Sequence, residues 1–297
     1  MRLPVALLAM ACLAGCNGSA PAPEVPLSAG EQAALALAVQ AQREGRSQEV
    51  ASLLAELLAR VPPPVDAQYV AGEAAYTLKR HGEAVERLTD AVTRKPEFLG
   101  NAATLGFAHY QLGQFEEAAT TFRQIVAARP SAYKAHYGLG LVALQQGRLD
   151  ESRTALSEAL RQQPDYLKAR FAWGRLMHAA GRLDEAAEAL ELVVAGWPSH
   201  HEALFQLAQV RAAQGRTQEA EALQARRALV YSVREELAGL EQQVLGGVDT
   251  PITWARMAQL LQALGEEEDA RQALAGGRRR FPAAPELQAP DPAAPER

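Results

Sequence analysis

The sequence predicts an all-α protein in which short antiparallel helix pairs stack into an elongated solenoid. Three observations carry this prediction. Between successive members of a regularly spaced set of prolines, the apolar residues recur at helical spacing in two short amphipathic segments. Aromatic residues make up only 6% of the 297 residues, which argues against large globular cores. The prolines themselves stand 34 residues apart, at Pro62, Pro96, Pro130, Pro164 and Pro198.

The composition is typical of a folded protein, with 48% hydrophobic residues, 22% charged residues and a net charge of −5. This mildly acidic balance does not favour general nucleic-acid binding. Both cysteines, Cys12 and Cys16, lie in the first sixteen residues. The rest of the chain therefore has no internal disulfide and no zinc site built from thiolates.

Residues 1–15 are typical of a secretion signal, because a positive start is followed by an apolar run too short to span a bilayer and then by small residues. Leu13-Ala14-Gly15-Cys16 resembles the bacterial lipobox. The resemblance implies cleavage before Cys16 and acylation of that cysteine. An ordinary signal peptide cut near Ala20, with Cys16 discarded, is the alternative.

Residues 16–30 are then the lipidated cysteine and a flexible tether, because they are rich in Pro, Gly, Ser and Ala and have no periodicity. Asn17 follows the cysteine. By resemblance to Gram-negative sorting, a residue other than Asp at this position points to the outer membrane. We therefore expect a lipid-anchored protein of the cell envelope, facing the periplasm if the host is Gram-negative.

The repeating unit is clearest in residues 133–166, where Leu139-Gly140 lies in the first helix, Gly147 at the turn, Leu156 in the second helix and Pro164 at its end. This order resembles the tetratricopeptide repeat. The resemblance implies a right-handed superhelical solenoid of about seven repeats. Six of them fill residues 31–234 without a break, and the units are 31–64, 65–98, 99–132, 133–166, 167–200, 201–234 and 251–284.

Each signature position has a packing reason. Small residues are expected where the two helices of a unit approach, at Ala38, Gly72, Gly106, Gly140, Gly174, Ala208 and Ala258. Glycine permits the positive φ that ends a first helix, at Gly45, Gly113, Gly147, Gly181, Gly215 and Gly265. Two positions depart from the pattern: Lys79 replaces the turn glycine of the second unit, and Ser152 replaces the small alanine of the fourth.

Helix starts are indicated by Ser28 with Glu31 and by Ser199 with Glu202, both spaced as capping boxes, and by Thr250 before Pro251.

The sixth unit has Ser232 where a closing proline is expected, so its second helix is predicted to run on through residues 217–245. Residues 235–250 form this extension and a linker. A stripe at heptad-like spacing follows the helix, comprising Val230, Val233, Leu237, Leu240 and Val244. Two heptads are too few for a coiled coil, so packing on its own solenoid is favoured over a dimer contact. The Pro- and Ala-rich residues 285–297 are expected to be disordered.

No catalytic, cofactor-binding or metal-binding site is predicted. Gly138-x-Gly140-x-x-Ala143 matches a relaxed dinucleotide fingerprint, but it lies inside a repeat helix and no strand precedes it. Four histidines and three arginines are the other candidates for a functional site, and each also has a purely structural interpretation. His200 and His201 are expected in an exposed turn, His109 and His136 at packing positions, and Arg278, Arg279 and Arg280 at a helix end, where they complement its dipole.

A binding surface is therefore the predicted functional feature. Stacked repeats leave their first helices lining an extended face, which in tetratricopeptide proteins holds peptides or partner segments. Half of the Tyr and Phe residues fall on it, although packing between repeats is an equal alternative for any one ring. The candidate partner-binding residues are Tyr69, Tyr76, Phe107, Tyr110, Tyr137, Leu141, Phe171, Arg175, His178 and Phe205. The matching asparagines of a carboxylate clamp are missing.

Three functional classes follow. The first is a lipid-anchored adaptor that binds a protein or peptide partner, with no nucleic acid involved. The second is a structural subunit of an envelope machine, similar to pilotins and polysaccharide-export lipoproteins. The third, an enzyme or small-molecule binder, is disfavoured because an open solenoid has no enclosed pocket. The sequence names neither the partner nor the oligomeric state.

Overall fold

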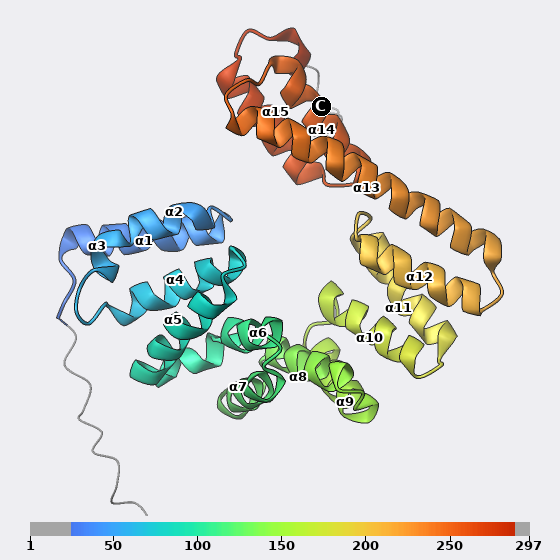
Figure 1. Cartoon of the computed structure of the whole chain (residues 1–297), viewed down its shortest axis with the longest axis horizontal. Helices are drawn as coiled ribbons and strands as arrows, with labels where there is room; N and C mark the ends of the chain where they lie inside the picture. Colours follow the sequence, from blue (N-terminus) through green and yellow to red (C-terminus); the bar gives the residue numbers. More distant parts are fainter. Residues whose placement is uncertain (1–24, 289–297) are drawn as a thin grey trace, which may run out of the picture. The chain divides into compact units, whose positions relative to one another are not determined.

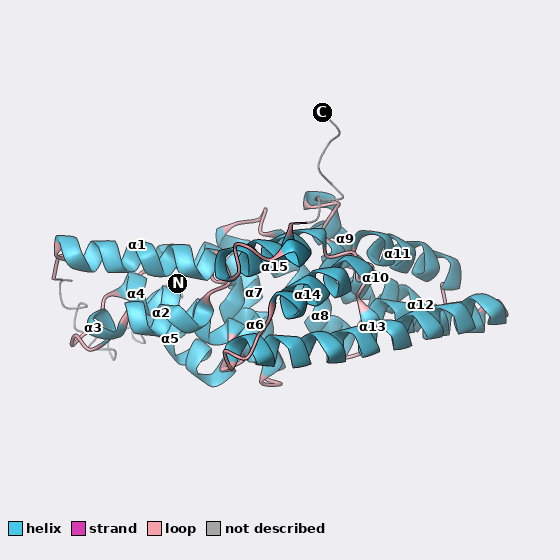
Figure 2. Ribbon diagram, turned by 90° about the horizontal axis from the view of Figure 1, so that it is seen from above, coloured by secondary structure: helices cyan, strands magenta, loops and turns pink. Residues whose placement is uncertain are grey.

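The computed structural model describes residues 25–288 and divides them into two compact units, residues 25–128 and 129–288. Each unit is built from helix pairs that follow one another along the chain (Figure 1). Within the described residues every regular element is a helix, as Figure 2 shows. The all-α prediction is confirmed. The signal peptide, Cys16 and most of the tether lie outside the described residues.

Unit 1 contains the first three helix pairs, and the second helix of the first pair is split into α2 and α3. The elements are α1 (Ala29–Arg43), α2 (Ser47–Leu53), α3 (Ala55–Leu58), α4 (Val65–Thr77), α5 (His81–Arg94), the 3-10 helix η1 (Pro96–Asn101), α6 (Ala103–Gln111) and α7 (Phe115–Ala128). The predicted capping box at Ser28 and Glu31 starts α1.

Unit 2 contains the remaining four pairs. Its elements are α8 (Tyr133–Gln145), α9 (Leu149–Gln162), α10 (Leu167–Ala179), α11 (Leu183–Gly196), α12 (His201–Ala213), α13 (Thr217–Leu245), α14 (Pro251–Ala263), α15 (Glu267–Arg280) and the 3-10 helix η2 (Pro285–Leu287). No described helix is both long enough and apolar enough to span a bilayer.

The close approach of paired helices is confirmed at the small positions of the first helices. A Cβ on Gly106 would lie 2.5 Å from a ring carbon of Phe122, and a Cβ on Gly140 would lie 2.5 Å from Cγ of Leu156. The corresponding distances at Gly72 and Gly174, to Leu88 and Leu190, are both 2.7 Å. Each glycine thus makes room for a large, buried side chain of the second helix.

The turns between paired helices use the left-handed backbone conformation, as predicted. The six predicted turn glycines have φ between 72° and 77°. Lys79 takes the same conformation, with φ of 62°, although a side chain is strained there. The repeated turn geometry therefore overrides the preference of the residue.

Alanine supplies most of the core, because the helices pack closely. The small position of the second helix is fully buried at Ala84, Ala118, Ala186 and, in the fourth unit, Ser152. The Ser152 hydroxyl donates a hydrogen bond of 2.9 Å to the carbonyl oxygen of Gly140. The buried hydroxyl therefore has a hydrogen-bond partner, so serine replaces alanine here without disturbing the packing.

Helix α13 continues past the end of α12 to reach α14 and α15 (Figure 1). The predicted stripe packs on the protein itself: Leu237 is 2% exposed, and Val230 and Val233 are also buried in the core cluster of unit 2. Arg256 of α14 forms an ion pair of 2.7 Å with Glu236 of α13. The extension is therefore the surface on which the seventh helix pair docks.

Two local predictions were wrong. Ser199 does not cap α12, because its hydroxyl donates instead to Glu266 at 2.7 Å, and the neighbouring His200 accepts the capping hydrogen bond from the Ala203 backbone. The disordered tail was predicted to begin at residue 285, but Pro285–Leu287 form η2 and Leu287 is fully buried. Arg278 holds this turn by donating to the Leu287 carbonyl oxygen at 2.6 Å. Residues 289–297 lie outside the described part of the chain.

Candidate partner-binding surface

The candidate surface is formed by the first helix of each pair and is called here the first-helix face. In α10 the side chains of Lys168, Phe171, Arg175 and His178 are separated by three or four residues, which places them on one side of the helix. Helix α12 neighbours α10, and His178 of α10 lies 3.5 Å from Gln206 of α12 through Nδ1 and Oε1. In unit 2 the surface therefore crosses from one pair to the next.

The ten residues predicted for this surface differ in exposure. Phe205 is exposed, at 36% of its surface. The other nine are half-buried, and Tyr137, Leu141 and Phe171 pack partly against the core cluster of unit 2. The rings therefore pack between helices and also contribute to the surface, because one edge of each ring is buried while another remains accessible.

Three of the rings are each covered by a second ring that was not among the predicted surface residues. Tyr69 lies 4.9 Å from Phe98, Tyr137 lies 5.2 Å from Tyr166, and Phe171 lies 4.8 Å from His200, measured between ring centroids. In each pair the second ring follows the first by 29 residues, just before the next first helix. Phe98, Tyr166 and His200 occupy the same position of the 34-residue repeat, and this shared position could have identified them from the sequence.

The rings of the third unit pack differently, because Ala103 and Ala132 occupy the two positions of the ring pair. Phe107 contacts Phe122 at 5.0 Å and Tyr110 contacts Phe115 at 5.5 Å, both on the paired helix α7. These rings consequently anchor the two helices of one unit to each other.

The sixth unit has no turn after its second helix, and a different arrangement covers Phe205. The Arg227 guanidinium lies 4.6 Å from the Phe205 ring centroid and 5.1 Å from that of Tyr231. The Tyr231 hydroxyl is 3.0 Å from Nδ1 of His201. We call Phe205, Arg227, Tyr231 and His201 the Arg227 cluster. Arginine with exposed aromatic rings is the composition most typical of an interface hot spot.

The first-helix face of unit 1 has a different charge. Asp66 at the start of α4 forms an ion pair of 2.7 Å with Lys95, and Glu73 follows on the same side of the helix. Tyr76 is half-buried, and burial raises the pKa of its phenol. Helix α4 of unit 1 thus carries Asp66 and Glu73 and no Lys or Arg, whereas α10 of unit 2 carries Lys and Arg and no Asp or Glu.

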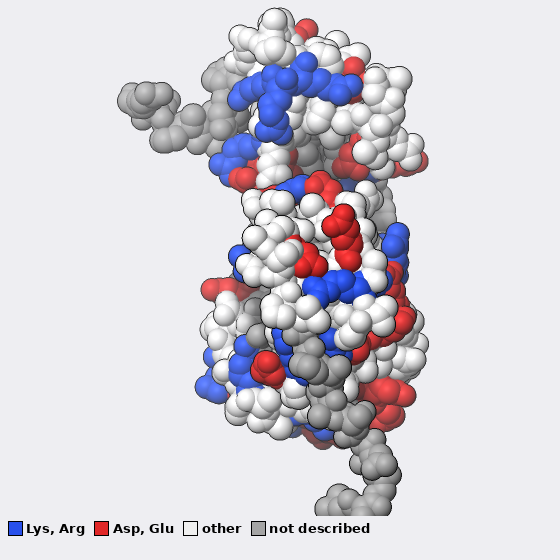
Figure 3. Space-filling view, turned by 90° about the vertical axis from the view of Figure 1, so that its left-hand side faces the viewer, with Lys and Arg blue, Asp and Glu red and all other residues white. Residues whose placement is uncertain are grey.

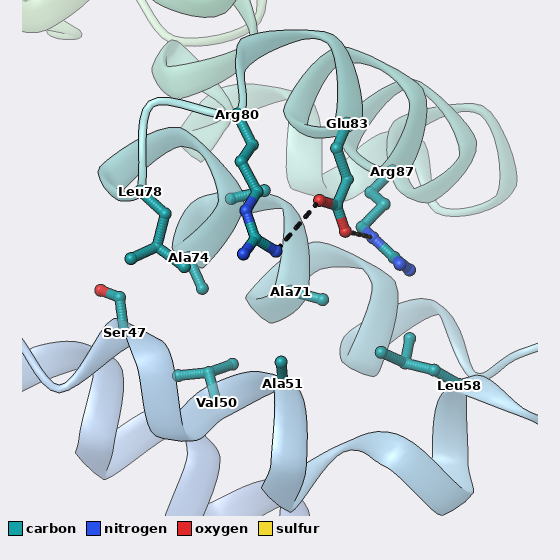
Figure 4. Close-up of a pocket in the computed structure, with 11 residues that line it drawn as sticks. Ser47, Val50, Ala51, Leu58, Ala71, Ala74, Leu78, Arg80, Glu83 and Arg87 are labelled. Atoms are coloured by element: carbon teal, nitrogen blue, oxygen red, sulfur yellow. Dashed lines mark hydrogen bonds and ion pairs between the residues drawn. The ribbon is translucent and has the colours of Figure 1, made fainter.

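A small hollow in unit 1 lies between α2–α3 and α4–α5. Figure 4 shows its apolar wall, with Val50 and Leu58 facing Ala71. At the rim, Glu83 pairs with Arg87 at 2.9 Å and with Arg80 at 3.8 Å. Its volume of ≈ 40 Å³ is far below the several hundred Å³ of a drug-sized ligand site. At most a small side chain of a partner fits there.

The histidines that were considered as functional groups all have structural contacts. His109 Nδ1 lies 2.7 Å from Oε1 of Gln114, and His136 Nε2 lies 2.9 Å from the Pro130 carbonyl oxygen. The prediction that His200 is exposed was wrong: it is half-buried and caps α12, and burial lowers the pKa of its imidazole. Across residues 25–288 no three metal-ligating side chains gather in one place.

The arginines at the end of α15 also have structural roles. Lys and Arg side chains gather at the upper end of the view in Figure 3, where α14 and α15 lie. Arg280 pairs with the buried Asp249 at 2.8 Å, and Arg278 holds η2. Their place in the last turn of α15 complements the helix dipole, as the sequence indicated.

Comparison with known families identifies the repeat. Family models described as tetratricopeptide repeat match residues 35–97, 104–166 and 177–243, well over half of the chain. The chain belongs to the tetratricopeptide repeat family. Each match covers two or more of the helices described above, so the repeat register and the observed helix pairs agree.

Solved tetratricopeptide structures resemble the chain. A thermophilic TPR protein of Thermus thermophilus is 26% identical with a TM-score of 0.51, over 61% of this chain and 98% of that chain. PilW, a type IV pilus biogenesis factor, is 19% identical with a TM-score of 0.49, over 88% and 98%. MamA is 18% identical with a TM-score of 0.47, over 55% and 96%. No curated protein sequence matches the chain.

Proposed function

We propose that this tetratricopeptide protein is a lipid-anchored scaffold of the bacterial cell envelope that binds a protein partner or peptide segment along the first-helix face of unit 2. The Arg227 cluster is the observation that carries this proposal, because it combines a fixed guanidinium with accessible Phe205 and Tyr231 rings. Tetratricopeptide proteins bind protein partners, and rings with one packed edge lose little conformational entropy when a partner covers the other.

The membrane anchor of the proposal rests on the sequence of residues 13–16. Several acyl chains on Cys16 would hold the protein at the membrane, since each buried methylene contributes about 0.8 kcal/mol. The tether would keep the helical body beside the membrane without docking it. A partner in the same membrane would then meet the binding face at high effective concentration, so a weak contact would suffice.

Metabolic labelling with a fatty acid tests the anchor. We expect label on the native chain and on a Cys12→Ser variant, but none on Cys16→Ser. Cys12→Ser is a matched control, because it removes a thiol from the same segment. Label retained by the Cys16→Ser variant would refute lipid attachment at this position.

Crosslinking in the native envelope tests the binding face. Replacing Phe205 by Ala should weaken recovery of the crosslinked partner several-fold while the far-UV circular dichroism stays unchanged. Leu192→Ala on the second helix α11 is the control, because it removes a comparable exposed apolar side chain, 47% accessible, from another face. Equal recovery with both variants would exclude this face.

The same experiment separates the two classes of envelope protein. A partner recovered in substoichiometric amounts, and released by washing, fits an adaptor. Stoichiometric recovery with one membrane complex would instead assign the chain as a structural subunit of an envelope machine.

A further inference from the structure

We infer that the segment bound by unit 2 is acidic and carries an apolar or aromatic side chain next to its carboxylates. This inference rests on the proposed function and specifies the chemistry of the partner. It is drawn from the separation of charge between first and second helices, from cations that have no carboxylate partner, and from the geometry of Arg227.

In the pairs α8–α9 and α10–α11 of unit 2, the acidic residues are confined to the second helices. Helices α8 and α10 contain four cations and no Asp or Glu: Lys134, Lys168, Arg170 and Arg175. Helices α9 and α11 carry the carboxylates of the same two pairs, namely Asp150, Glu151, Glu158, Asp184, Glu185, Glu188 and Glu191. Glu202 is the one acid on α12. Because the whole chain has a net charge of −5, this basic face is a local feature and not a consequence of composition.

Three of the cations on α8 and α10 have no carboxylate partner within residues 25–288, unlike Arg211 of α12 and Arg256 of α14, which form ion pairs. In the described part of unit 2, no ion pair involves Lys134, Lys168 or Arg175. On the second helix α9, by contrast, Arg161 binds Glu158 at 2.6 Å, and its hydrogen bonds lower the pKa of that carboxyl to about 2. Uncompensated cations on one face raise the local positive potential, which attracts an acidic segment.

Arg227 offers a fixed site for a carboxylate. Its Nη2 lies 3.4 Å from the Tyr231 hydroxyl, and the two rings hold the guanidinium in place. Its Nε is buried and has no hydrogen-bond partner among the described residues. A buried donor without a partner is costly, and a planar guanidinium suits bidentate binding of a carboxylate. A carboxylate of the bound segment would therefore pair with the guanidinium at its Nη nitrogens, because the buried Nε is not accessible to a partner.

The extension of α13 creates this site. In the second, fourth and fifth units a ring from the following turn covers the first-helix ring, whereas α13 continues and brings Arg227 and Tyr231 over Phe205 instead. The rings remain accessible, with Phe205 at 36% and Tyr231 at 46% exposure. An apolar or aromatic side chain beside the bound carboxylate can therefore pack on them.

Two synthetic peptide pools test the inference. Both have about ten residues, which extend over roughly 33 Å, and both mix Phe and Leu with polar positions. The polar positions are Asp and Glu in the acidic pool and Asn and Gln in the amide pool. We expect the purified full chain to retain the acidic pool at least about tenfold more strongly, with the preference falling as salt is raised. Equal retention would overturn the inference.

Substitutions then locate the binding site. Arg175→Gln and Arg227→Gln should each weaken binding of the acidic pool several-fold and leave the amide pool unchanged. Arg153→Gln on α9 is the matched control, because it removes the same charge from a second helix that pairs locally with Asp150. Arg227→Lys separates charge from geometry, since it keeps the cation and loses the planar fork. The inference also fails if Arg153→Gln weakens binding as much as Arg227→Gln.

The outcomes distinguish this inference from the proposed function. One outcome is that partner crosslinking is lost in Phe205→Ala and yet is insensitive to salt and to Arg227→Gln. In that case the face binds a partner, and the inference that the bound segment is acidic is refuted. If the acidic pool binds but no partner crosslinks to this face, the proposed function fails alone. Tighter binding of single-stranded oligothymidylate than of the acidic pool would overturn the inference in favour of a nucleic acid.

Discussion

Replacing Gly140 by alanine is expected to destabilise unit 2, although alanine is the better helix former. In the middle of a helix, alanine is favoured over glycine by about 1 kcal/mol. In α8, however, the new Cβ would lie 2.5 Å from Cγ and 2.6 Å from Cδ2 of Leu156, which is fully buried. Overpacking of this kind costs about 1–3 kcal/mol. Because the overlap at 2.5 Å is with a fully buried side chain, we expect the steric cost to exceed the propensity gain, with a net loss of up to about 2 kcal/mol.

Gly239 is the matched control for this prediction. It lies inside α13, and a Cβ there would meet nothing within 4 Å. Gly239→Ala should consequently stabilise the protein by up to about 1 kcal/mol, because only the helix propensity changes. Urea unfolding followed by far-UV circular dichroism measures both variants. Amide hydrogen exchange in α8 and α9 locates the effect, since stability in a repeat array is largely local.

A double variant tests the steric reason directly. Leu156→Ala alone removes the crowding atoms and should cost about 2–5 kcal/mol through the cavity that it leaves. In that background Gly140→Ala should become stabilising, so the sign of its effect reverses. Stabilisation by Gly140→Ala in the native background, equal to that of Gly239→Ala, would refute the argument that helix approach selects glycine.

Three further variants test other contacts. Lys79→Gly should raise the free energy of unfolding by about 0.5–1 kcal/mol, because it removes a side chain from a residue in the left-handed conformation, with φ of 62°; a lower free energy of unfolding would contradict this. Leu237→Ala should cost about 2–5 kcal/mol and speed hydrogen exchange in α14 and α15 before α8 and α9; uniform acceleration would show that α13 does not act as a local dock. His200→Asn keeps a cap and should reduce the loss of stability on acidification. Burial lowers the pKa of His200 in the folded protein, so the unfolded chain takes up the proton first as the pH falls through about 6.5. An unchanged pH dependence of the unfolding midpoint would exclude His200 as its source.

Sequence-based predictions were correct wherever the interacting residues lie within one turn or one repeat. The capping box at Ser28, the left-handed turns and the small positions all follow from contacts that the 34-residue register repeats. Lys79 illustrates the strength of this register, since the same turn forms without glycine. The Leu237 stripe was also predictable, because its heptad-like spacing requires an apolar partner somewhere.

The errors arose where a residue had two possible partners. Ser199 has the spacing of a cap, but the docked turn between α14 and α15 brings Glu266 to it, and His200 caps the helix instead. Leu287 lies in a Pro-rich segment that looks disordered, yet η2 buries it with the help of Arg278. Composition alone does not show that a neighbouring surface will cover such a residue.

The repeat family, the helix pairs and the positions that require small residues or positive φ could all be predicted from the amino-acid sequence. These features depend on local geometry and on a period that can be read along the chain. The accessible face of each ring and the cations without a carboxylate partner could be identified only from the three-dimensional arrangement of the helices. Both depend on distances between helices: Arg227 and Phe205, 22 positions apart in the sequence, meet because α13 continues where the other repeats turn.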